Sequence, residues 1–376
     1  MAPRETTSPG ALARRLAGKQ VLVCVGAGGV GKTTTSAAIA LGLAMRGQKV
    51  AVVTIDPARR LASALGLQEL SGEPHRIDDA ELSGAGIELK GELWALMLDT
   101  KRTFDDVVAR LASDEDARQE ILANPVYREL STAVAGSQEL GAIAKLYELH
   151  SEADFDVIVL DTPPSRNALD FLDAPGRLLG FLDGRALQVF LAPSGLTARL
   201  FGRGTALVFA IFARVTGVDM LNELSSFFRT MSSVIGGFGE RTRRVASLLR
   251  ASETSFLIIT SPEPEPASEA AFLAERLRAA GMSLGEVVVN RVHLDGLGGH
   301  SSEQVSELLA PALGGALAGR VASNLADFDV LAARDHAAIT KLAGLLASGE
   351  PIVVPQLDED VQDLLGLARI AEYLFQ

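Results

Sequence analysis

The sequence predicts a doubly wound α/β fold, in which helices cover both faces of a mostly parallel sheet. Two observations support this prediction. Short β-branched and apolar runs alternate with helical segments, and several runs are apolar throughout, as in strands that are buried on both faces. In addition, a glycine-rich segment at residues 26–33 separates the first apolar run from a long helical segment, which is the arrangement of a phosphate-binding loop.

The predicted elements place a set of polar residues at one edge of the sheet. The first strand covers residues 20–25, and an alanine-rich helix follows from residue 32 to 46 and ends at Gly47. The other strand candidates are residues 50–55, 93–98, 155–160, 256–260, 286–290 and 352–354. Ligands of such folds bind beyond the carboxyl ends of the strands. The polar residues at those ends are Asp56, Asp161, Ser261 and Asn290.

The rhythm of strands and helices predicts a flexible tail at residues 1–17 and a single domain at 18–376. Two helical insertions interrupt this domain, at about 100–153 and 176–250, and the second is unusually apolar. Residues 262–266, in which proline alternates with glutamate, are interpreted as a loop after a strand.

The net charge and the cysteine count limit the kinds of partner and the cell compartment that we expect for this protein. The formal net charge of −12 and the isoelectric point of about 5.0 argue against nucleic acid as a main partner. Cys24 is the only cysteine, so one chain has neither a disulfide framework nor a thiolate metal cluster, as is typical of a cytoplasmic protein. No secretory signal is visible. The most apolar stretch, 206–213, is too short to cross a bilayer, so any membrane contact is expected to be peripheral.

Residues 26–33, GAGGVGKT, fit the phosphate-loop pattern G-x-x-x-x-G-K-[ST]. We expect Lys32 to reach the β- and γ-phosphates and the Thr33 hydroxyl to coordinate Mg²⁺. The alternative is a glycine-rich turn with a chance lysine, which the flanking strand and helix disfavour. The expected nucleotide contacts are Gly28, Gly29, Val30, Gly31, Lys32, Thr33 and Thr34.

Two aspartates at strand ends complete the predicted catalytic site. Asp56 precedes Pro57; it either orients the water that attacks the γ-phosphate or caps a helix, and the two roles are compatible. Asp161 follows the apolar residues 157–160 and suits a ligand of Mg²⁺. Since no Asn-Lys-x-Asp motif of GTP-binding proteins is present, Asn290 is interpreted as a contact to an adenine edge.

With these residues the chain resembles the ArsA family of arsenite-pump ATPases and the related ATPases that target tail-anchored membrane proteins, which belong to the MinD-like (SIMIBI) group of P-loop NTPases. Asp56-Pro57-Ala58 matches the family's first switch, and Asp161-Thr162-Pro163-Pro164-Ser165 matches its second. Pro355-Gln356-Leu357 is similar to the carboxy-terminal Pro-x-Leu segment, which makes Pro355 a nucleotide contact. Residues 164–172 are most similar to the actinobacterial ArsA-like paralogues.

The resemblance implies a dimeric, magnesium-dependent ATPase that couples its nucleotide state to a protein or membrane-protein partner. It implies ATP and Mg²⁺ as cofactors, Asp56 and Lys32 as catalytic residues, and Thr33 and Asp161 as the metal site. A metabolic kinase on the same loop is a weaker alternative, because no dedicated base for an acceptor is visible.

One departure from the family concerns catalysis. The family's loop begins Gly-Lys-Gly-Gly, and that lysine reaches the partner subunit's nucleotide, whereas this chain has Ala27. Either another residue replaces the charge, a lysine-bearing paralogue supplies it in a heterodimer, or hydrolysis is slow. Arg59 and Arg60 are the nearest replacements; the alternative is that they form solvated helix surface.

Two further departures concern cargo and dimerisation. Arsenite binding needs several thiolates, so one cysteine predicts a different cargo and excludes the inter-subunit zinc held by a Cys-x-x-Cys pair. The apolar interval 176–250 lies where the targeting ATPases bind their clients. Its candidate lining residues either form a client groove or pack into a core or dimer contact. They are Leu207, Val208, Phe209, Ile211, Phe212, Val215, Val218, Leu221, Leu224, Phe227, Phe228, Met231 and Val234.

Overall fold

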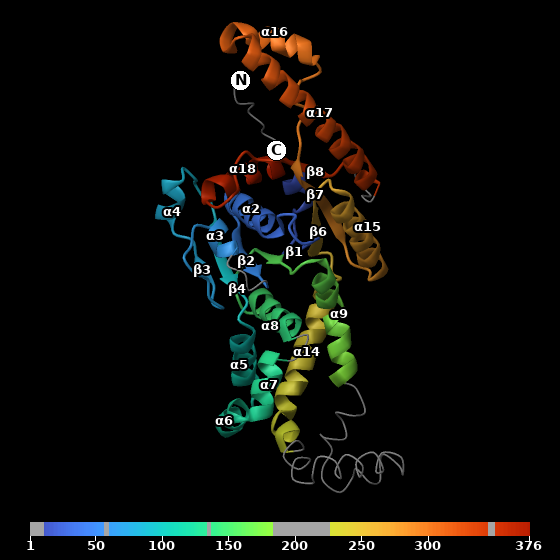
Figure 1. The fold of residues 1–376 in the computed structure, drawn as a ribbon. Helices are drawn as coiled ribbons and strands as arrows, with labels where there is room; N and C mark the ends of the chain where they lie inside the picture. The colour runs from blue at the N-terminus through green and yellow to red at the C-terminus, as the bar shows by residue number, and fades with distance from the viewer. Residues whose placement is uncertain (1–10, 56–59, 134–136, 183–225, 345–349) are drawn as a thin grey trace. The chain divides into compact units, whose positions relative to one another are not determined.

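A computed structural model describes most of the chain (Figure 1) and divides it into two compact units. The described residues are 11–55, 60–133, 137–182, 226–344 and 350–376. The first unit comprises Met1–Met97, Phe155–Leu169 and Leu249–Gln376. The second comprises Leu98–Asp154 and Asp170–Leu248.

An eight-stranded sheet forms the centre of the first unit, in the order β3-β4-β2-β5-β1-β6-β7-β8 (Figure 1). Its strands are β1 (Val21–Val25), β2 (Lys49–Thr54), β3 (His75–Arg76), β4 (Glu92–Met97), β5 (Val157–Asp161), β6 (Thr254–Thr260), β7 (Leu284–Val292) and β8 (Ile352–Pro355). The short edge strand β3 pairs antiparallel with β4, and the other pairs are parallel. The carboxyl ends of the parallel strands therefore share one edge of the sheet.

The apolar character of the central strands explains their place. All five residues of β1 are buried, and this strand pairs with both β5 and β6. Alternate residues of the strands join one buried cluster, which also contains Ile39 of α2 (Lys32–Ala44) and Leu367 of α18 (Leu364–Phe375). The intervening strand residues are also buried, and α15 (Pro264–Ala279) packs on β6 and β7. The prediction of a doubly wound, mostly parallel sheet is confirmed.

The remaining helices of this unit surround the sheet or extend from it. They are α1 (Ala11–Arg15), α3 (Arg60–Ala64), α4 (Asp79–Gly84), α16 (Ser302–Leu313) and α17 (Gly315–Ala343). α16 begins with a capping box, in which the Ser301 hydroxyl accepts from the Gln304 amide. It packs against α17.

The second unit is helical. The helices among its described residues are α5 (Thr100–Leu111), α6 (Glu115–Ala123), α7 (Pro125–Ala133), α8 (Ser137–Ser151) and α14 (Ser232–Leu248). α9 (Ser165–Leu182) begins in the first unit and continues in this one. Aspartate side chains start two of them: Asp99 accepts from the Arg102 amide and Asp114 from the Ala117 amide. The core contains Val107, Tyr127 and Phe238.

Most predicted elements agree with the structure, and three do not. The predicted strands match within two residues at each end. The sequence analysis missed β3, which is only two exposed residues long. The prediction of a loop at 262–266 is wrong, because Pro264 begins α15. Proline suits the first turn of a helix, where the backbone N–H has no partner within the helix. The predicted flexible tail at residues 1–17 extends too far into the chain, because Leu12 of α1 and Leu16 are buried. Residues 1–10 lie outside the described part.

Candidate nucleotide-binding site

The glycine-rich segment forms a loop between β1 and α2, as predicted. Gly31 caps α2 with φ of 88°, a left-handed conformation that glycine adopts without strain. A Cβ on Gly31 would lie 2.4 Å from Asn290 Nδ2, and a Cβ on Gly26 would lie 1.9 Å from the Ile259 carbonyl oxygen. The loop thus approaches its neighbours closely while its amides remain at the N-terminus of α2, where the helix dipole favours an anion.

Lys32 is folded back against this loop. Its side chain is buried, and Nζ donates a 2.7 Å hydrogen bond to the carbonyl oxygen of Ala27. The ammonium group is therefore held within the phosphate loop itself. Ala27 is 6% exposed and belongs to the buried cluster beneath the loop.

A hydroxyl and a carboxylate meet beside the loop. Thr33 Oγ1 donates to Asp161 Oδ2 at 2.7 Å, and Thr54 Oγ1 donates to the same oxygen at 3.0 Å. The register explains this convergence, because Thr54 of β2 lies opposite Asp161 of β5, which also pairs with Cys24 of β1. Hydroxyl and carboxylate oxygens are the ligands that Mg²⁺ prefers, so this pair fits the ion: Thr33 would hold it directly, and Asp161 directly or through water.

Asn290 contacts the loop from β7. Its Nδ2 donates a 3.0 Å hydrogen bond to the carbonyl oxygen of Val30. The pairing of β7 with β8 shifts register between Val289 and Val292, and within this irregularity Arg291 has φ of 61°. A left-handed conformation is uncommon for a residue with a side chain and often marks a functional position. The Gln356 amide donates to the Val292 carbonyl oxygen and closes the irregularity.

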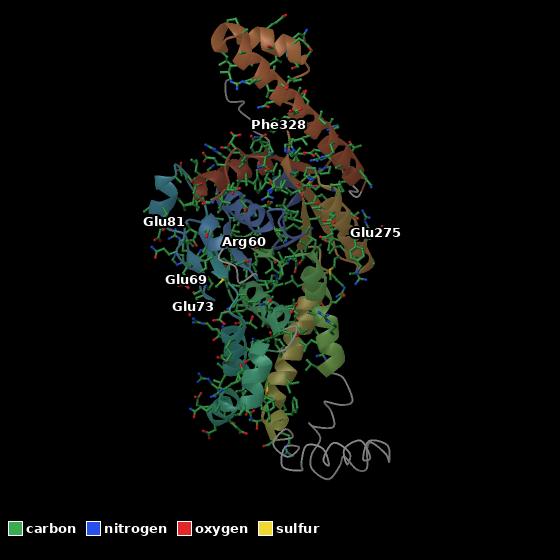
Figure 2. All side chains as sticks on the ribbon, viewed as in Figure 1. Arg60, Glu69, Glu73, Glu81, Glu275 and Phe328 are labelled. Atoms are coloured by element: carbon green, nitrogen blue, oxygen red, sulfur yellow. The ribbon has the colours of Figure 1, made fainter. Side chains whose placement is uncertain are left out.

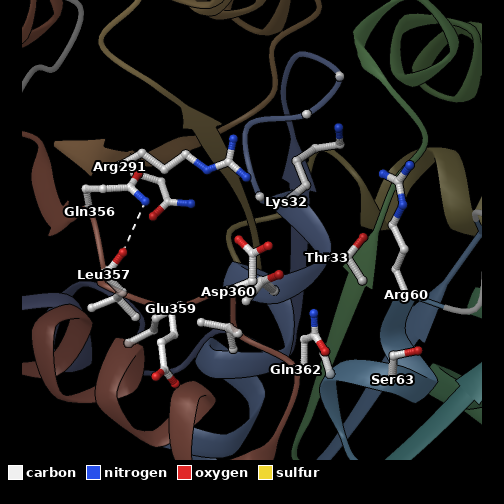
Figure 3. Close-up of a pocket in the computed structure, with 18 of the residues that line it drawn as sticks. Lys32, Thr33, Arg60, Ser63, Arg291, Gln356, Leu357, Glu359, Asp360 and Gln362 are labelled. Carbon is white, nitrogen blue, oxygen red and sulfur yellow. Dashed lines mark hydrogen bonds between the residues drawn. The ribbon is translucent and has the colours of Figure 1, made fainter.

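A cavity of about 970 Å³ lies at this edge of the sheet and has the size of a small-molecule site. Figure 3 shows most of the lining side chains, which lie at the carboxyl ends of β7 and β8 or in the segments that follow β1, β2, β5 and β8. Of the predicted nucleotide contacts, the lining includes Gly28, Gly29, Gly31, Lys32, Thr33, Thr34, Asn290 and Pro355. Val30 is buried beneath the loop and meets Asn290 through its carbonyl.

The structure adds lining residues to the sequence prediction. Arg60 and Ser63 of α3 line the cavity, as do Arg291, Gln356 and Asp360. Arg291 was missed although it directly follows Asn290, because an arginine at a strand end is usually solvated surface. Asp56 and Arg59 lie outside the described residues.

Only some of the residues predicted to line a client groove in the apolar interval 176–250 belong to the described part of the chain. Phe227 and Val234 are buried in the helical core, and Phe228 and Met231 pack against it. These four residues therefore serve packing. The other nine candidates of the predicted client groove, which lie between residues 207 and 224, fall outside the described residues.

The strand–loop–helix unit, the hydroxyl–carboxylate pair and the cavity define a P-loop nucleoside triphosphate-binding protein. A model of the ArsA ATPase family, described as anion-transporting ATPase, matches residues 19–297. The chain belongs to this family.

Relatives from bacteria, archaea and fungi agree with this assignment. A putative arsenical pump-driving ATPase of Halobacterium salinarum is 33% identical over 176 residues, which are 46% of this chain and 26% of that protein. ATPase GET3 of Malassezia globosa is 25% identical over 277 residues, 72% of each chain. Putative arsenical pump-driving ATPase 1 of Aquifex aeolicus is 26% identical over 281 residues, 73% of this chain and 63% of that protein. The chain thus spans about a quarter of the Halobacterium relative.

Within the described residues, no helix has the length and hydropathy that crossing a membrane requires. Burial raises the pKa of the Cys24 thiol to about 12, and the side chain is inaccessible.

Proposed function

We propose that this protein is a magnesium-dependent ATPase that works as a dimeric switch and couples its nucleotide state to a protein or membrane-protein partner. The observation that carries the proposal is the 2.7 Å contact between Thr33 Oγ1 and Asp161 Oδ2 at the mouth of the phosphate loop. A hydroxyl and an acid at these two places are the protein ligands that a P-loop nucleotide–magnesium complex needs.

The topology supports one orientation of the nucleotide. The phosphates belong at the loop after β1 and at the N-terminus of α2. Mg²⁺ and the γ-phosphate belong on the side of β5 and β2, because Asp161 and Thr54 lie there. The base then extends towards β7 and β8, where Asn290 and Pro355 line the cavity. With Nδ2 engaged by the Val30 carbonyl, Oδ1 of Asn290 can accept a hydrogen bond from the adenine amino group.

The chain's own groups have separate tasks in hydrolysis. Bound Mg²⁺ would neutralise phosphate charge between Thr33 and Asp161. Lys32, whose Nζ donates to the Ala27 carbonyl in this structure, turns to the β- and γ-phosphates when a nucleotide binds. Asp56 orients the attacking water and holds its proton.

A second candidate function is a nucleotide-gated scaffold that hydrolyses little alone and pairs with a lysine-bearing paralogue. Ala27 favours it, since an alanine supplies no charge to a partner's nucleotide. If the dimer is formed by two copies of this chain, hydrolysis is slow unless another cation takes this part.

We propose a cargo other than arsenite, because the chain's single thiol is buried beneath the phosphate loop. The printed names of the relatives favour two kinds of cargo, arsenicals and the clients of GET3-type ATPases; the second is compatible with one cysteine. We place the protein in the cytoplasm, where ATP and Mg²⁺ are available, with membrane contact only through a partner and no role for nucleic acid.

Steady-state ATP turnover with and without Mg²⁺ tests the enzymatic proposal. We expect turnover in the wild type that Lys32→Ala and Asp56→Asn abolish; turnover that survives both substitutions contradicts it. Pull-downs in ATP, in ADP and without nucleotide test the switch, and the proposal requires a partner whose capture depends on the nucleotide. Turnover that rises only when a lysine-bearing paralogue is added favours the scaffold.

A further inference from the structure

We propose that Arg60 contacts the γ-phosphate and supplies, from the same chain, the catalytic positive charge that Ala27 does not provide. This inference rests on the proposed ATP hydrolysis and names a catalytic residue for it. Arg60 is the first residue of α3 and lines the nucleotide cavity together with Ser63 and Thr33 (Figure 3).

The position of Arg60 in the fold places it at the phosphate end of the cavity. It follows β2 by six residues, and Thr54 at the end of β2 hydrogen-bonds Asp161, the proposed magnesium ligand. The β2 end and the β7 end lie on opposite sides of β1 in the sheet. Arg60 therefore belongs to the γ-phosphate side, and Arg291 to the base side. In the view of Figure 3, the Lys32 ammonium group lies between the two guanidinium groups.

Arg60 is available for a ligand. Its side chain is exposed at the start of α3 (Figure 2). In the part of the chain that the structure describes, it takes part in no recorded hydrogen bond or ion pair. Other arginines have structural partners: Arg46 donates to the Gly42 carbonyl, and Arg110 pairs with Glu148. An arginine that lines a phosphate cavity without such a partner can bind an anion without first breaking a contact.

The chemistry calls for a second cation at this place. A transferring γ-phosphoryl group spreads negative charge over three oxygens, and one lysine and one metal ion leave part of it uncompensated. Guanidinium groups bind two phosphate oxygens at once and remain charged at every physiological pH. Ala27 carries only a methyl group and cannot supply this charge. Among the described residues on this wall of the cavity, Arg60 is the side chain that can supply it.

The alternative role, a solvated surface arginine, predicts a different result. Surface charges far from the reacting atoms alter neither the turnover number nor the affinity for a transition-state mimic. A catalytic arginine contributes mainly to the transition state, so its removal lowers kcat while ADP binding changes little.

The test compares Arg60→Ala and Arg60→Lys with Arg320→Ala, a matched control that removes an exposed arginine of α17 outside the cavity. We expect Arg60→Ala to lower kcat for ATP about 100-fold or more, with the ADP dissociation constant changed less than about threefold. Arg60→Lys retains part of the rate, and Arg320→Ala retains all of it. Unchanged kcat in Arg60→Ala overturns the inference.

A binding measurement decides the inference even if the wild type turns over no ATP, a result that would contradict the proposed function. Mg·ADP with aluminium fluoride mimics the transferring phosphoryl group, and calorimetry gives its affinity. We expect Arg60→Ala to weaken this complex at least about tenfold relative to the wild type, while the affinity for ADP alone stays the same. Equal affinities of the two proteins for the mimic overturn the role of Arg60.

Discussion

Thr33 Oγ1 and Asp161 Oδ2 lie 2.7 Å apart although 128 residues separate them in the chain. Thr33 stands on the first turn of α2, and Asp161 ends β5, which pairs with β1. Thr54 holds the same carboxylate oxygen from β2. One helix and two neighbouring strands, α2, β5 and β2, thus hold one acid beside the phosphate loop, where the proposed magnesium ion would bind.

We predict that Asp161→Asn weakens magnesium binding and slows the proposed ATPase. A neutral amide is a poor ligand for a hard cation, so we expect kcat to fall about 100-fold or more. Binding of metal-free ADP should persist, because the loop amides remain. Titration of turnover and of ADP affinity with Mg²⁺ measures both effects.

Thr54→Val serves as the comparison for Asp161→Asn, because it changes a neighbour of the carboxylate and not the carboxylate itself. It keeps the carboxylate and removes one hydrogen bond to it, so we expect the apparent magnesium affinity to fall only about tenfold. If Asp161→Asn has the same magnesium titration as the wild type, Asp161 is not a metal ligand.

We predict that Gly31→Ala weakens both the fold and nucleotide binding. Its φ of 88° costs a non-glycine residue about 1–2 kcal/mol. The new Cβ would also lie 2.4 Å from Asn290 Nδ2 and so displace the bond to the Val30 carbonyl. Urea unfolding and ADP calorimetry should show lower stability and at least about tenfold weaker binding.

Gly31→Ala in the background of Asn290→Ala distinguishes the backbone strain from the steric contact with Asn290. There the steric contact is absent, so Gly31→Ala should cost less free energy of unfolding than it does in the wild type, with the backbone strain remaining. Additive effects of the two substitutions would show that Asn290 does not crowd the loop.

The sequence predicted the sheet well because buried parallel strands have a strong local signature. Runs such as Val21–Val25 and residues 157–160 are apolar throughout and flanked by helical segments. β3 lacked such a signature, since His75 and Arg76 are both exposed. The start of α15 was misjudged because local composition favoured a loop, whereas proline at a first turn costs no hydrogen bond.

Sequence analysis could predict the parts of the site that lie within one short segment of the chain. The phosphate loop and Asp161 could be recognised as motifs, but their mutual contact depends on strand order, which local patterns do not encode. For the same reason sequence reasoning could not decide whether Arg60 is surface or site. Its place on the cavity wall follows from β2 lying next to β5.

We predict that Cys24 is inert in the folded protein. The thiol is fully buried, and burial raises its pKa to about 12. At pH 8 the thiolate is therefore about one part in ten thousand. Ellman's reagent should not react with the native protein within an hour, and it should titrate one thiol after denaturation. Rapid native labelling would show that β1 opens.

His293 and Asp335 connect the end of β7 to α17. Asp335 Oδ2 accepts from the His293 amide at 3.0 Å and lies 2.7 Å from His293 Nδ1, and Arg334 donates to Oδ1. Burial alone would raise the pKa of Asp335. The hydrogen bonds and charge of His293 and Arg334 outweigh burial and hold the pKa below its usual value.

We therefore predict that Asp335→Asn destabilises the protein at neutral pH and much less in acid. A carboxyl with a lowered folded pKa stabilises the fold above its unfolded pKa of about 3.9, and this stabilisation is lost as the pH falls through the folded value. Removing a charged hydrogen-bond partner should cost about 2 kcal/mol at pH 7. Urea unfolding of the wild type, Asp335→Asn and the exposed control Asp327→Asn at pH 7 and pH 3 tests this. A cost that is independent of pH would mean that the charge of Asp335 does not anchor α17.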